Sequence, residues 1–323
     1  MWTKFIFKQI DLLFNIPQNT YLSPECKRMA KNIVYNEDAK EICKLDIYTR
    51  RKNTKKRTPV FINIHGGGFV AGDKYFRRGF CTYVASLGFK VININYGLCP
   101  KYKYPDFLSH IVKAIKWCEE NSLEYGLDMS KVIISGDSAG AYIASCICIA
   151  SYNEEYRKML NIESFNTRFL ATALFCGPYI PTVAFSEPIA FNINTKLWTD
   201  VTGEIALSIE DLKKYKYFNM LDCDQFIEKD FPPTFITHSD NDLFCRGHAE
   251  RLIEILIQNS VPVWEIHSLD DIHDWHEVMG IRSSRTTLHE FERFLLDVMQ
   301  NNISPNKHVS ITTKKGKMIV IPN

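Results

Sequence analysis

One serine stands in a sequence pattern that is typical of an activated hydroxyl nucleophile. Residues 136–140 read Gly-Asp-Ser-Ala-Gly, which places Ser138 at the centre of a G-x-S-x-G motif. The motif follows a strand-like run at residues 131–135 and precedes an apolar helical run at residues 141–150. In a strand–turn–helix setting the glycines permit a sharp turn that lifts the serine hydroxyl clear of the sheet. We therefore expect Ser138 to be a nucleophile, and a glycine-rich turn without chemistry is the alternative.

A run of glycines provides candidate donors for the charge that such a nucleophile creates. His65 is followed by three glycines at residues 66–68, directly after the strand-like run at residues 59–64. Attack on a carbonyl creates an oxyanion that needs preorganised N–H donors, and consecutive glycines let the backbone approach it closely. A phosphate-binding loop is the competing interpretation, but no Lys-Ser/Thr pair follows and the G-x-G-x-x-G spacing is absent. The run therefore favours an oxyanion hole.

The elements that must position these motifs alternate along the chain. Residues 42–48 alternate in polarity, as an antiparallel edge strand would. Further short runs rich in Val, Ile and Phe predict strands at 59–64, 90–95, 131–135, 169–175, 233–238 and 261–268. Helical patterns lie between them, near 76–87, 106–123, 139–152, 246–259 and 282–300. This order predicts an α/β fold with a mostly parallel sheet and helices on both faces, whose ligands bind at the carboxyl ends of the strands. Both motifs fall at such ends.

Two segments depart from this alternation, and both are predicted to act as a small cap. Residues 177–230 are too long for a simple crossover, and long insertions at this edge of a sheet are usually functional. Residues 1–15 carry apolar side chains at helical spacing and are expected to pack on their own domain. A membrane-surface helix is the alternative, although it would need a more basic polar face. We expect one domain over residues 1–323, with cap elements at about 1–25 and 177–230; residues 303–323 receive no assignment.

Charge, cysteine content and hydropathy argue against several classes of protein. The chain has 39 basic and 37 acidic residues and a net charge of +2, so no nucleic-acid partner is expected. Ten cysteines are scattered without a C-x-x-C pair, and no secretory signal is recognised. They are expected to be reduced and buried, which favours a cytoplasmic location. No run approaches the length of a membrane-spanning helix, so no transmembrane segment is predicted. The oligomeric state cannot be read from the sequence.

Taken together, the two motifs resemble those of the hormone-sensitive-lipase-like esterases of the α/β-hydrolase superfamily. The H-G-G-G run precedes G-D-S-A-G, and the similarity extends from about residue 45 to residue 300, including Gly72-Asp73 and Tyr96-x-Leu98-x-Pro100. The resemblance implies an α/β-hydrolase fold, a triad in the chain order Ser, Asp, His, and neither a cofactor nor a metal ion.

The same resemblance assigns roles to individual residues. Ser138 matches the nucleophile of the family. The backbone N–H groups of Gly67, Gly68 and Ala139 would form the oxyanion hole, within a loop that Gly66 and His65 shape.

The acid of the triad is expected after the strand at residues 233–238. The family places its acid just before an apolar pair at this strand end, which matches Asp242. Asp240 is the alternative, two residues away on the same turn. Whichever of the two is not the acid would cap the helix that follows.

The base is expected in the loop after the last predicted strand, which contains His273 and His276. The segment around His273 resembles the family's His-Gly-Phe element, with Asp274-Trp275 in place of Gly-Phe. We therefore choose His273, and His276 is the alternative. A histidine base must be neutral, so we expect activity to fall on acidification through roughly pH 6.5.

These assignments predict a carboxylic ester hydrolase that forms an acyl-enzyme on a small-molecule ester, with a short to medium acyl chain. Amide hydrolysis, as in arylformamidase-like hydrolases, is the nearest alternative, and acyl transfer to another alcohol is a third possibility. A non-catalytic ligand-binding hydrolase fold is a different class of function. Such receptors typically lose the triad histidine, whereas His273 is present here.

Overall fold

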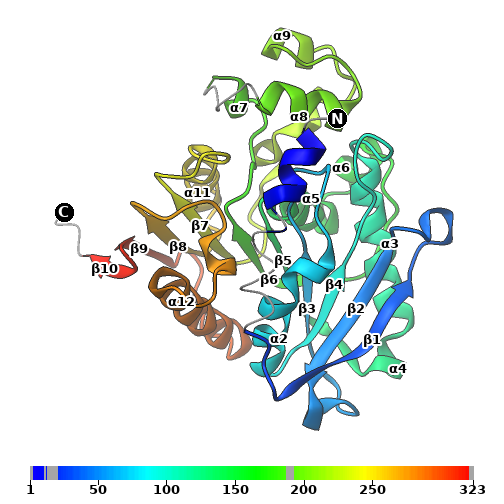
Figure 1. Ribbon diagram of the computed structural model, residues 1–323, viewed down its shortest axis with the longest axis vertical. Helices are drawn as coiled ribbons and strands as arrows, with labels where there is room; N and C mark the ends of the chain where they lie inside the picture. Colours follow the sequence, from blue (N-terminus) through cyan, green and yellow to red (C-terminus); the bar gives the residue numbers. More distant parts are fainter. Residues whose placement is uncertain (1–2, 11, 13–20, 187–192, 320–323) are drawn as a thin grey trace.

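The computed structural model describes residues 3–10, 12, 21–186 and 193–319 of the chain. Ten strands form one mixed sheet in the order β1-β2-β4-β3-β5-β6-β7-β8-β9-β10 (Figure 1). The strands from β4 to β9 run parallel to one another, whereas β1, β2 and β10 pair antiparallel with their neighbours. The predicted α/β-hydrolase fold is confirmed.

The central strands are buried on both faces, because helices cover the sheet from both sides. This explains why they read as continuous apolar runs rather than as alternating ones. All residues of β4 are buried, and so are nearly all of those in β3. The bounds of the strands are β1 Cys26–Val34, β2 Lys44–Arg50, β3 Thr58–Ile64, β4 Lys90–Ile94, β5 Leu127–Asp137, β6 Phe169–Phe175, β7 Thr234–Ser239, β8 Val263–Ser268, β9 His308–Lys314 and β10 Lys317–Ile319.

Alternate residues of each central strand belong to different layers of the core. In β3, Ile62 and Ile64 pack into the layer formed with α3 (Asp106–Glu120), α5 (Ala139–Tyr152) and α11 (His248–Gln258). Phe61, between them, packs into the opposite layer with α2 (Arg78–Ser86) and α12 (Arg282–Met299). The predicted helices therefore lie on both faces of the sheet.

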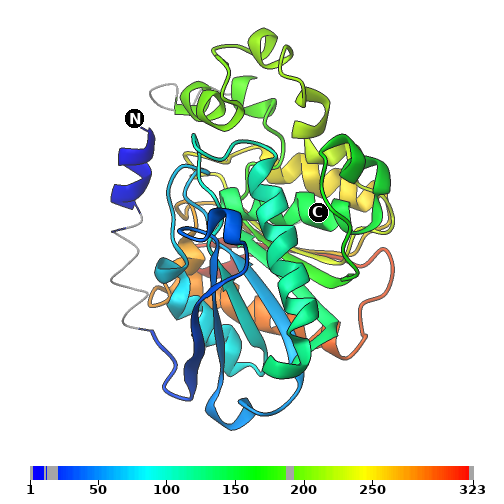
Figure 2. The same cartoon turned by 90° about the vertical axis from the view of Figure 1, so that its right-hand side faces the viewer.

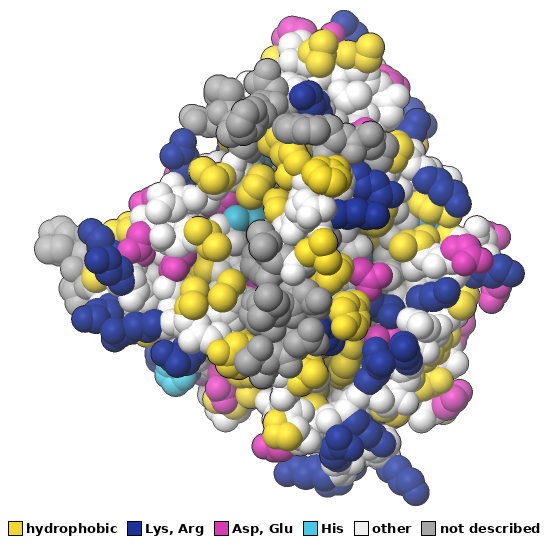
Figure 3. All heavy atoms as spheres, viewed as in Figure 1, with side chains coloured by type: hydrophobic (Ala, Val, Ile, Leu, Met, Phe, Trp, Pro, Cys, Tyr) yellow, Lys and Arg dark blue, Asp and Glu magenta, His cyan; other side chains and the backbone are white. Residues whose placement is uncertain are grey.

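The cap region stands beyond the carboxyl ends of the strands, beside the N-terminal helical residues 3–10 (Figures 1 and 2). A hydrogen bond of 2.6 Å from Thr3 Oγ1 to Asp200 Oδ2 ties this N-terminal helix to the cap. Between the cap and the body of the molecule, hydrophobic side chains gather on the surface (Figure 3). The cap contains α7 (Val183–Ser186), α8 (Ile193–Thr202), α9 (Ile209–Leu212), α10 (Phe218–Leu221) and the 3₁₀ turn η5 (Cys223–Phe226).

The remaining helical elements are short. They are α4 (Ser122–Tyr125) and α6 (Glu154–Met159), with 3₁₀ turns η1 (Glu37–Ala39), η2 (Arg51–Asn53), η3 (Lys74–Arg77) and η6 (Trp275–Glu277). Within the described part of the chain, no helix is long and apolar enough to cross a membrane.

The sequence-based prediction missed three strands. β2 was expected at the edge of the sheet, but β1 pairs with it and takes that position. β9 and β10 form in the tail, for which no element was predicted. The outer strands are partly exposed and polar, so their hydrophobic pattern is weak. Parts of two predicted segments, residues 1–2, 11 and 13–20 of the N-terminal region and 187–192 of the insertion, lie outside the described residues.

Candidate active site

Ser138 occupies a strained turn between the end of β5 and the start of α5. Its backbone has φ 50° and ψ −122°, a conformation that non-glycine residues rarely adopt. Its N–H donates to the Phe175 carbonyl at 2.7 Å, which fixes the turn. A Cβ at Gly136 would lie 2.2 Å from the Gly140 carbonyl oxygen, and one at Gly140 would lie 2.1 Å from the Ile64 oxygen. Both glycines of the motif are therefore required by packing.

The glycine loop after β3 lies against this turn. Gly67 and Gly68 have φ of 110° and 59°, which favour glycine. Their N–H groups and that of Ala139 donate to no other group in the described part of the chain. The Gly66 N–H, by contrast, donates to Asp137 Oδ2 at 2.9 Å. The N–H groups of Gly67, Gly68 and Ala139 are thus available to a ligand.

Asp137 anchors the loop through a buried ion pair that the sequence did not reveal. Arg77, in η3, donates from Nε to Asp137 Oδ1 at 2.9 Å and from Nη2 to Oδ2 at 2.5 Å. Burial alone would raise the pKa of Asp137, but the Arg77 guanidinium holds it below its ordinary value. Asp137 therefore stays ionised and bonds the Gly66 N–H. Asp137 belongs to the motif, whereas no pattern in the sequence marks Arg77 as its partner.

The predicted acid and base lie together beyond β7 and β8. His273 Nδ1 is 2.7 Å from Asp242 Oδ2. Asp242 Oδ1 accepts from the N–H groups of Phe244 and Cys245, at 2.8 and 2.9 Å. Burial would raise the pKa of Asp242, but His273 and these N–H groups lower it below its ordinary value. The carboxylate is therefore ionised and fixes the ring of His273.

The alternative acid and base are engaged elsewhere. Asp240 Oδ1 lies 2.7 Å from His267 Nε2, on the exposed side of the loop. His276 is buried, and its ring stacks on that of Phe175 with centroids 4.0 Å apart. Within the described residues, neither side chain forms a hydrogen bond or ion pair with Asp242 or His273.

A second carboxyl group lies at the other nitrogen of His273. Asp274 Oδ2 is 3.3 Å from Nε2, and Oδ1 is buried without a hydrogen-bond partner. Burial raises the pKa of Asp274 to about 7, with a further contribution from Asp137 and an opposing one from His273. Burial would lower the pKa of His273, but Asp242 and Asp274 raise it to about 9. Sequence reasoning noted Asp274 only as a replacement of glycine.

Ser138 lines a pocket of which His273 is not a lining residue. Within the described residues, no hydrogen bond joins Ser138 Oγ to His273, a separation that is common in enzymes without substrate. Phe244 lies next to both residues. It lines the pocket of Ser138, and the centroid of its ring is 5.1 Å from that of the His273 ring. Ser138 in its strained turn and the oriented ring of His273 therefore lie on either side of Phe244.

The pocket beside Ser138 is narrow and mostly apolar. The space open to the centre of a water molecule is about 30 Å³. The ring of Phe7, from the N-terminal helix, packs directly against Gly68 and closes this side of the pocket. A Cβ at Gly68 would lie 2.7 Å from carbons of that ring. The other lining residues are Gly68, Phe69, Ser138, Ala139, Pro178, Ala184, Ile193, Leu197, Trp198, Phe244, Cys245 and His248.

The sequence matches the BD-FAE family over residues 45–252, which is more than half of the chain. The chain belongs to the BD-FAE family. This confirms the resemblance to the hormone-sensitive-lipase-like esterases of the α/β-hydrolase superfamily.

Individual proteins similar to this chain are also named as lipases or esterases. Lipase 2 of Moraxella sp. is 35% identical over 100 residues, which are 31% of this chain and 23% of that protein. The probable carboxylic ester hydrolase LipM of Mycobacterium tuberculosis is 26% identical over 272 residues, 79% of this chain and 58% of that protein. The chain thus spans less than two thirds of either relative. An inhibited esterase B of Lactobacillus rhamnosis shares the fold, with a TM-score of 0.81 at 20% identity over 93% of this chain and 96% of that one.

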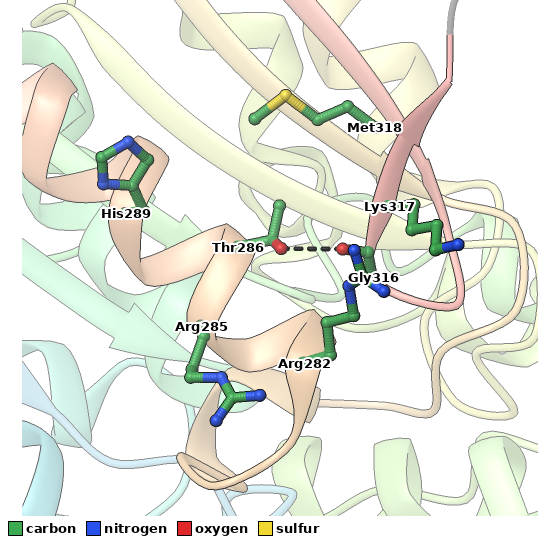
Figure 4. Close-up of a pocket in the computed structure, with 7 residues that line it drawn as sticks. All are labelled: Arg282, Arg285, Thr286, His289, Gly316, Lys317 and Met318. Atoms are coloured by element: carbon green, nitrogen blue, oxygen red, sulfur yellow. Dashed lines mark hydrogen bonds between the residues drawn. The ribbon is translucent and has the colours of Figure 1, made fainter.

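Two further features of the molecule bring together groups that could bind a ligand. Cys176, Asp242 and His273 bring potential metal ligands within 4.8 Å of one another, but a metal there would have to displace the bond between Asp242 and His273. A second hollow lies between α12 and β10 (Figure 4). Arg282, Arg285 and His289 on its rim are exposed, and it shares no lining residue with the pocket of Ser138. The Ser138 pocket is therefore the candidate active site.

Proposed function

We propose that the protein is a carboxylic ester hydrolase in which Ser138, Asp242 and His273 form the catalytic triad. The observation that carries the proposal is the bond of 2.7 Å between His273 Nδ1 and Asp242 Oδ2, next to a serine held in a strained turn. Named esterases and lipases among the relatives support the same chemistry.

The mechanism follows from the placement of these groups. His273, when neutral, removes the proton from Ser138 Oγ as the oxygen attacks the ester carbonyl, and Asp242 stabilises the imidazolium that forms. The N–H groups of Gly67, Gly68 and Ala139 then donate to the oxyanion. A single donor of this kind contributes about 2.7–4 kcal/mol to the stability of a transition state. His273 next gives its proton to the leaving alcohol, and water hydrolyses the acyl-enzyme with His273 again as base.

The dimensions of the pocket favour a short acyl chain. The space open to the centre of a water molecule is only about 30 Å³, so the pocket is tight beside Ser138. Phe7 and Trp198 close it, so a long chain would need the N-terminal helix or the cap to move. We therefore propose that residues 3–10 and the insertion act as cap elements of a single domain and restrict the acyl group to about two to four carbons.

The ten cysteines support a proposed location in a reducing compartment such as the cytoplasm. All of them are free and buried in the structure, and buried thiols without partners behave as small hydrophobic side chains. Thiol titration of the protein denatured without reductant, after purification from its native source, should give ten reactive groups.

The decisive experiment is hydrolysis of p-nitrophenyl acetate, butyrate and octanoate by the wild type and by Ser138→Ala. We expect turnover that declines steeply at octanoate, and a loss of about a million-fold in the variant. A fluorophosphonate probe should label the wild type and leave the variant unlabelled. Turnover that survives in Ser138→Ala would contradict the assigned nucleophile, and a wild type that hydrolyses amides but no ester would contradict the assigned substrate class.

A further inference from the structure

The pocket beside Ser138 contains one polar side chain that the mechanism does not use. His248 is the first residue of α11, is only 2% exposed, and lines the pocket among aromatic and aliphatic side chains. A buried polar group normally has a hydrogen-bond partner, because desolvation without one is costly. The hydrogen-bond partners of the two ring nitrogens of His248 therefore indicate which kind of ligand the pocket binds.

The tautomer of His248 is fixed by the backbone. The N–H of Ile180 donates to Nδ1 at 3.2 Å, so Nδ1 carries a lone pair and the proton resides on Nε2. Burial lowers the pKa of His248 to about 4, so the ring is neutral at ordinary pH. Nε2 is thus a fixed N–H donor.

This donor has no hydrogen-bond partner among the residues that the structure describes. No hydrogen bond from Nε2 is present within the described residues, and the atom is not among the polar atoms that are sealed from solvent. Because the residue is nearly inaccessible overall and lines the pocket, the remaining opening for Nε2 is the pocket itself. The site therefore presents one unpaired N–H inside otherwise apolar walls.

We propose that His248 is a specificity residue whose Nε2–H binds an oxygen acceptor within the acyl chain of the substrate. The substrates are then esters of short acids that carry an ether or keto oxygen a few atoms from the carbonyl. The acyl half of the substrate remains on Ser138 while the alcohol departs. The enclosed pocket that contains His248 therefore suits the acyl half rather than the leaving group. This inference rests on the proposed esterase function.

Two esters of equal size isolate the contact. p-Nitrophenyl methoxyacetate and p-nitrophenyl butyrate differ by one oxygen in place of one methylene, so both fit the pocket equally. Their intrinsic reactivities differ, but that difference is the same for every enzyme variant and cancels when ratios of kcat/KM are compared between variants.

The matched variants are His248→Asn and His248→Gln. Asparagine places an acceptor near the position of Nδ1 and can keep the bond from Ile180, but it loses the donor at Nε2. Glutamine reaches the position of Nε2 with an amide N–H. We expect the ratio of methoxyacetate to butyrate kcat/KM to fall about tenfold in His248→Asn and to stay within about threefold of the wild type in His248→Gln. Equal ratios in all three proteins would overturn the proposal.

Binding of the free acids to the wild type provides a test that needs neither a variant nor turnover. Calorimetric titration with methoxyacetate and with butyrate should give about tenfold tighter binding of methoxyacetate. Equal affinities, or tighter binding of butyrate, would overturn the role of His248 even if the protein proves to be an esterase. Absence of ester hydrolysis together with the expected preference in binding would contradict the proposed function and leave the acceptor site standing.

Discussion

At the scale of single residues, the ring of His273 lies between two carboxyl groups, with Asp242 Oδ2 at 2.7 Å from Nδ1 and Asp274 Oδ2 at 3.3 Å from Nε2. Ser138, Asp242 and His273 were chosen from motif and loop position, and the structure brings the last two together. Asp274 and His248 could not be assigned, because their importance depends on which atoms of other elements they face.

Titration of His273 should set the pH dependence of activity. Its ordinary pKa led to the sequence-based expectation of a fall near pH 6.5, but the carboxylates of Asp242 and Asp274 raise the pKa to about 9. The base must be neutral, so activity should be highest above that pKa and decline as the pH falls through about 9. The measurement is kcat/KM for p-nitrophenyl butyrate between about pH 5 and pH 10. A midpoint near 6.5 would show that these two carboxylates do not raise the pKa of His273.

Replacing Asp274 should move this midpoint to lower pH. Asp274→Asn removes the charge 3.3 Å from Nε2, and asparagine tolerates the left-handed backbone with φ 53°. A neighbouring opposite charge shifts a pKa by about 1–3 units, so the acid limb should shift downward by at least about one unit. Asp240→Asn is the matched control, because its carboxylate contacts His267 instead. Identical profiles for both variants would contradict the role given to Asp274.

At the scale of elements, the strands of the buried centre were predictable and the outer ones were not. β3, β4 and the C-terminal parts of β5 and β6 are buried and mostly apolar because both of their faces are covered. β1 and β9 are partly exposed, so their residues do not separate into a clear inner and outer face. The N-terminal helix was predicted from its period, but only the contact of Phe7 with Gly68 shows which feature of the site it covers.

Removing the Phe7 ring should lengthen the acyl chains that the pocket accepts. Phe7 is buried and closes the pocket over Gly68, next to Phe244 with ring centroids 6.0 Å apart. We expect Phe7→Ala to raise the ratio of octanoate to butyrate kcat/KM by about tenfold or more, since each methylene admitted contributes to binding. Phe5→Ala, on the exposed side of the same helix, should leave the ratio unchanged. An equal effect of both substitutions would show that the helix does not limit the pocket.

At the scale of the whole molecule, the parallel sheet gathers the site from distant parts of the chain. The loops after β3, β5, β7 and β8 supply the glycine loop, Ser138, Asp242 and His273 in turn. Because these strands run parallel in one sheet, their carboxyl ends meet at one edge. The order of elements therefore predicts where the site is, whereas the extent of the sheet beyond β8 depends on pairing that no local pattern reveals.

The tail should be part of the structure that supports the base. β9 pairs in parallel with β8 from Val263 to Ser268, and the loop after β8 carries His273. A chain that ends at residue 302 would leave β8 as an unpaired edge and expose apolar side chains beneath it. We expect its melting temperature to fall by at least about 5 °C, with a parallel loss of activity. A chain that ends after Lys314 loses β10, whose residues are exposed, and should melt within about 2 °C of the full protein. Equal melting of the two truncated chains would show that β9 contributes nothing to the sheet.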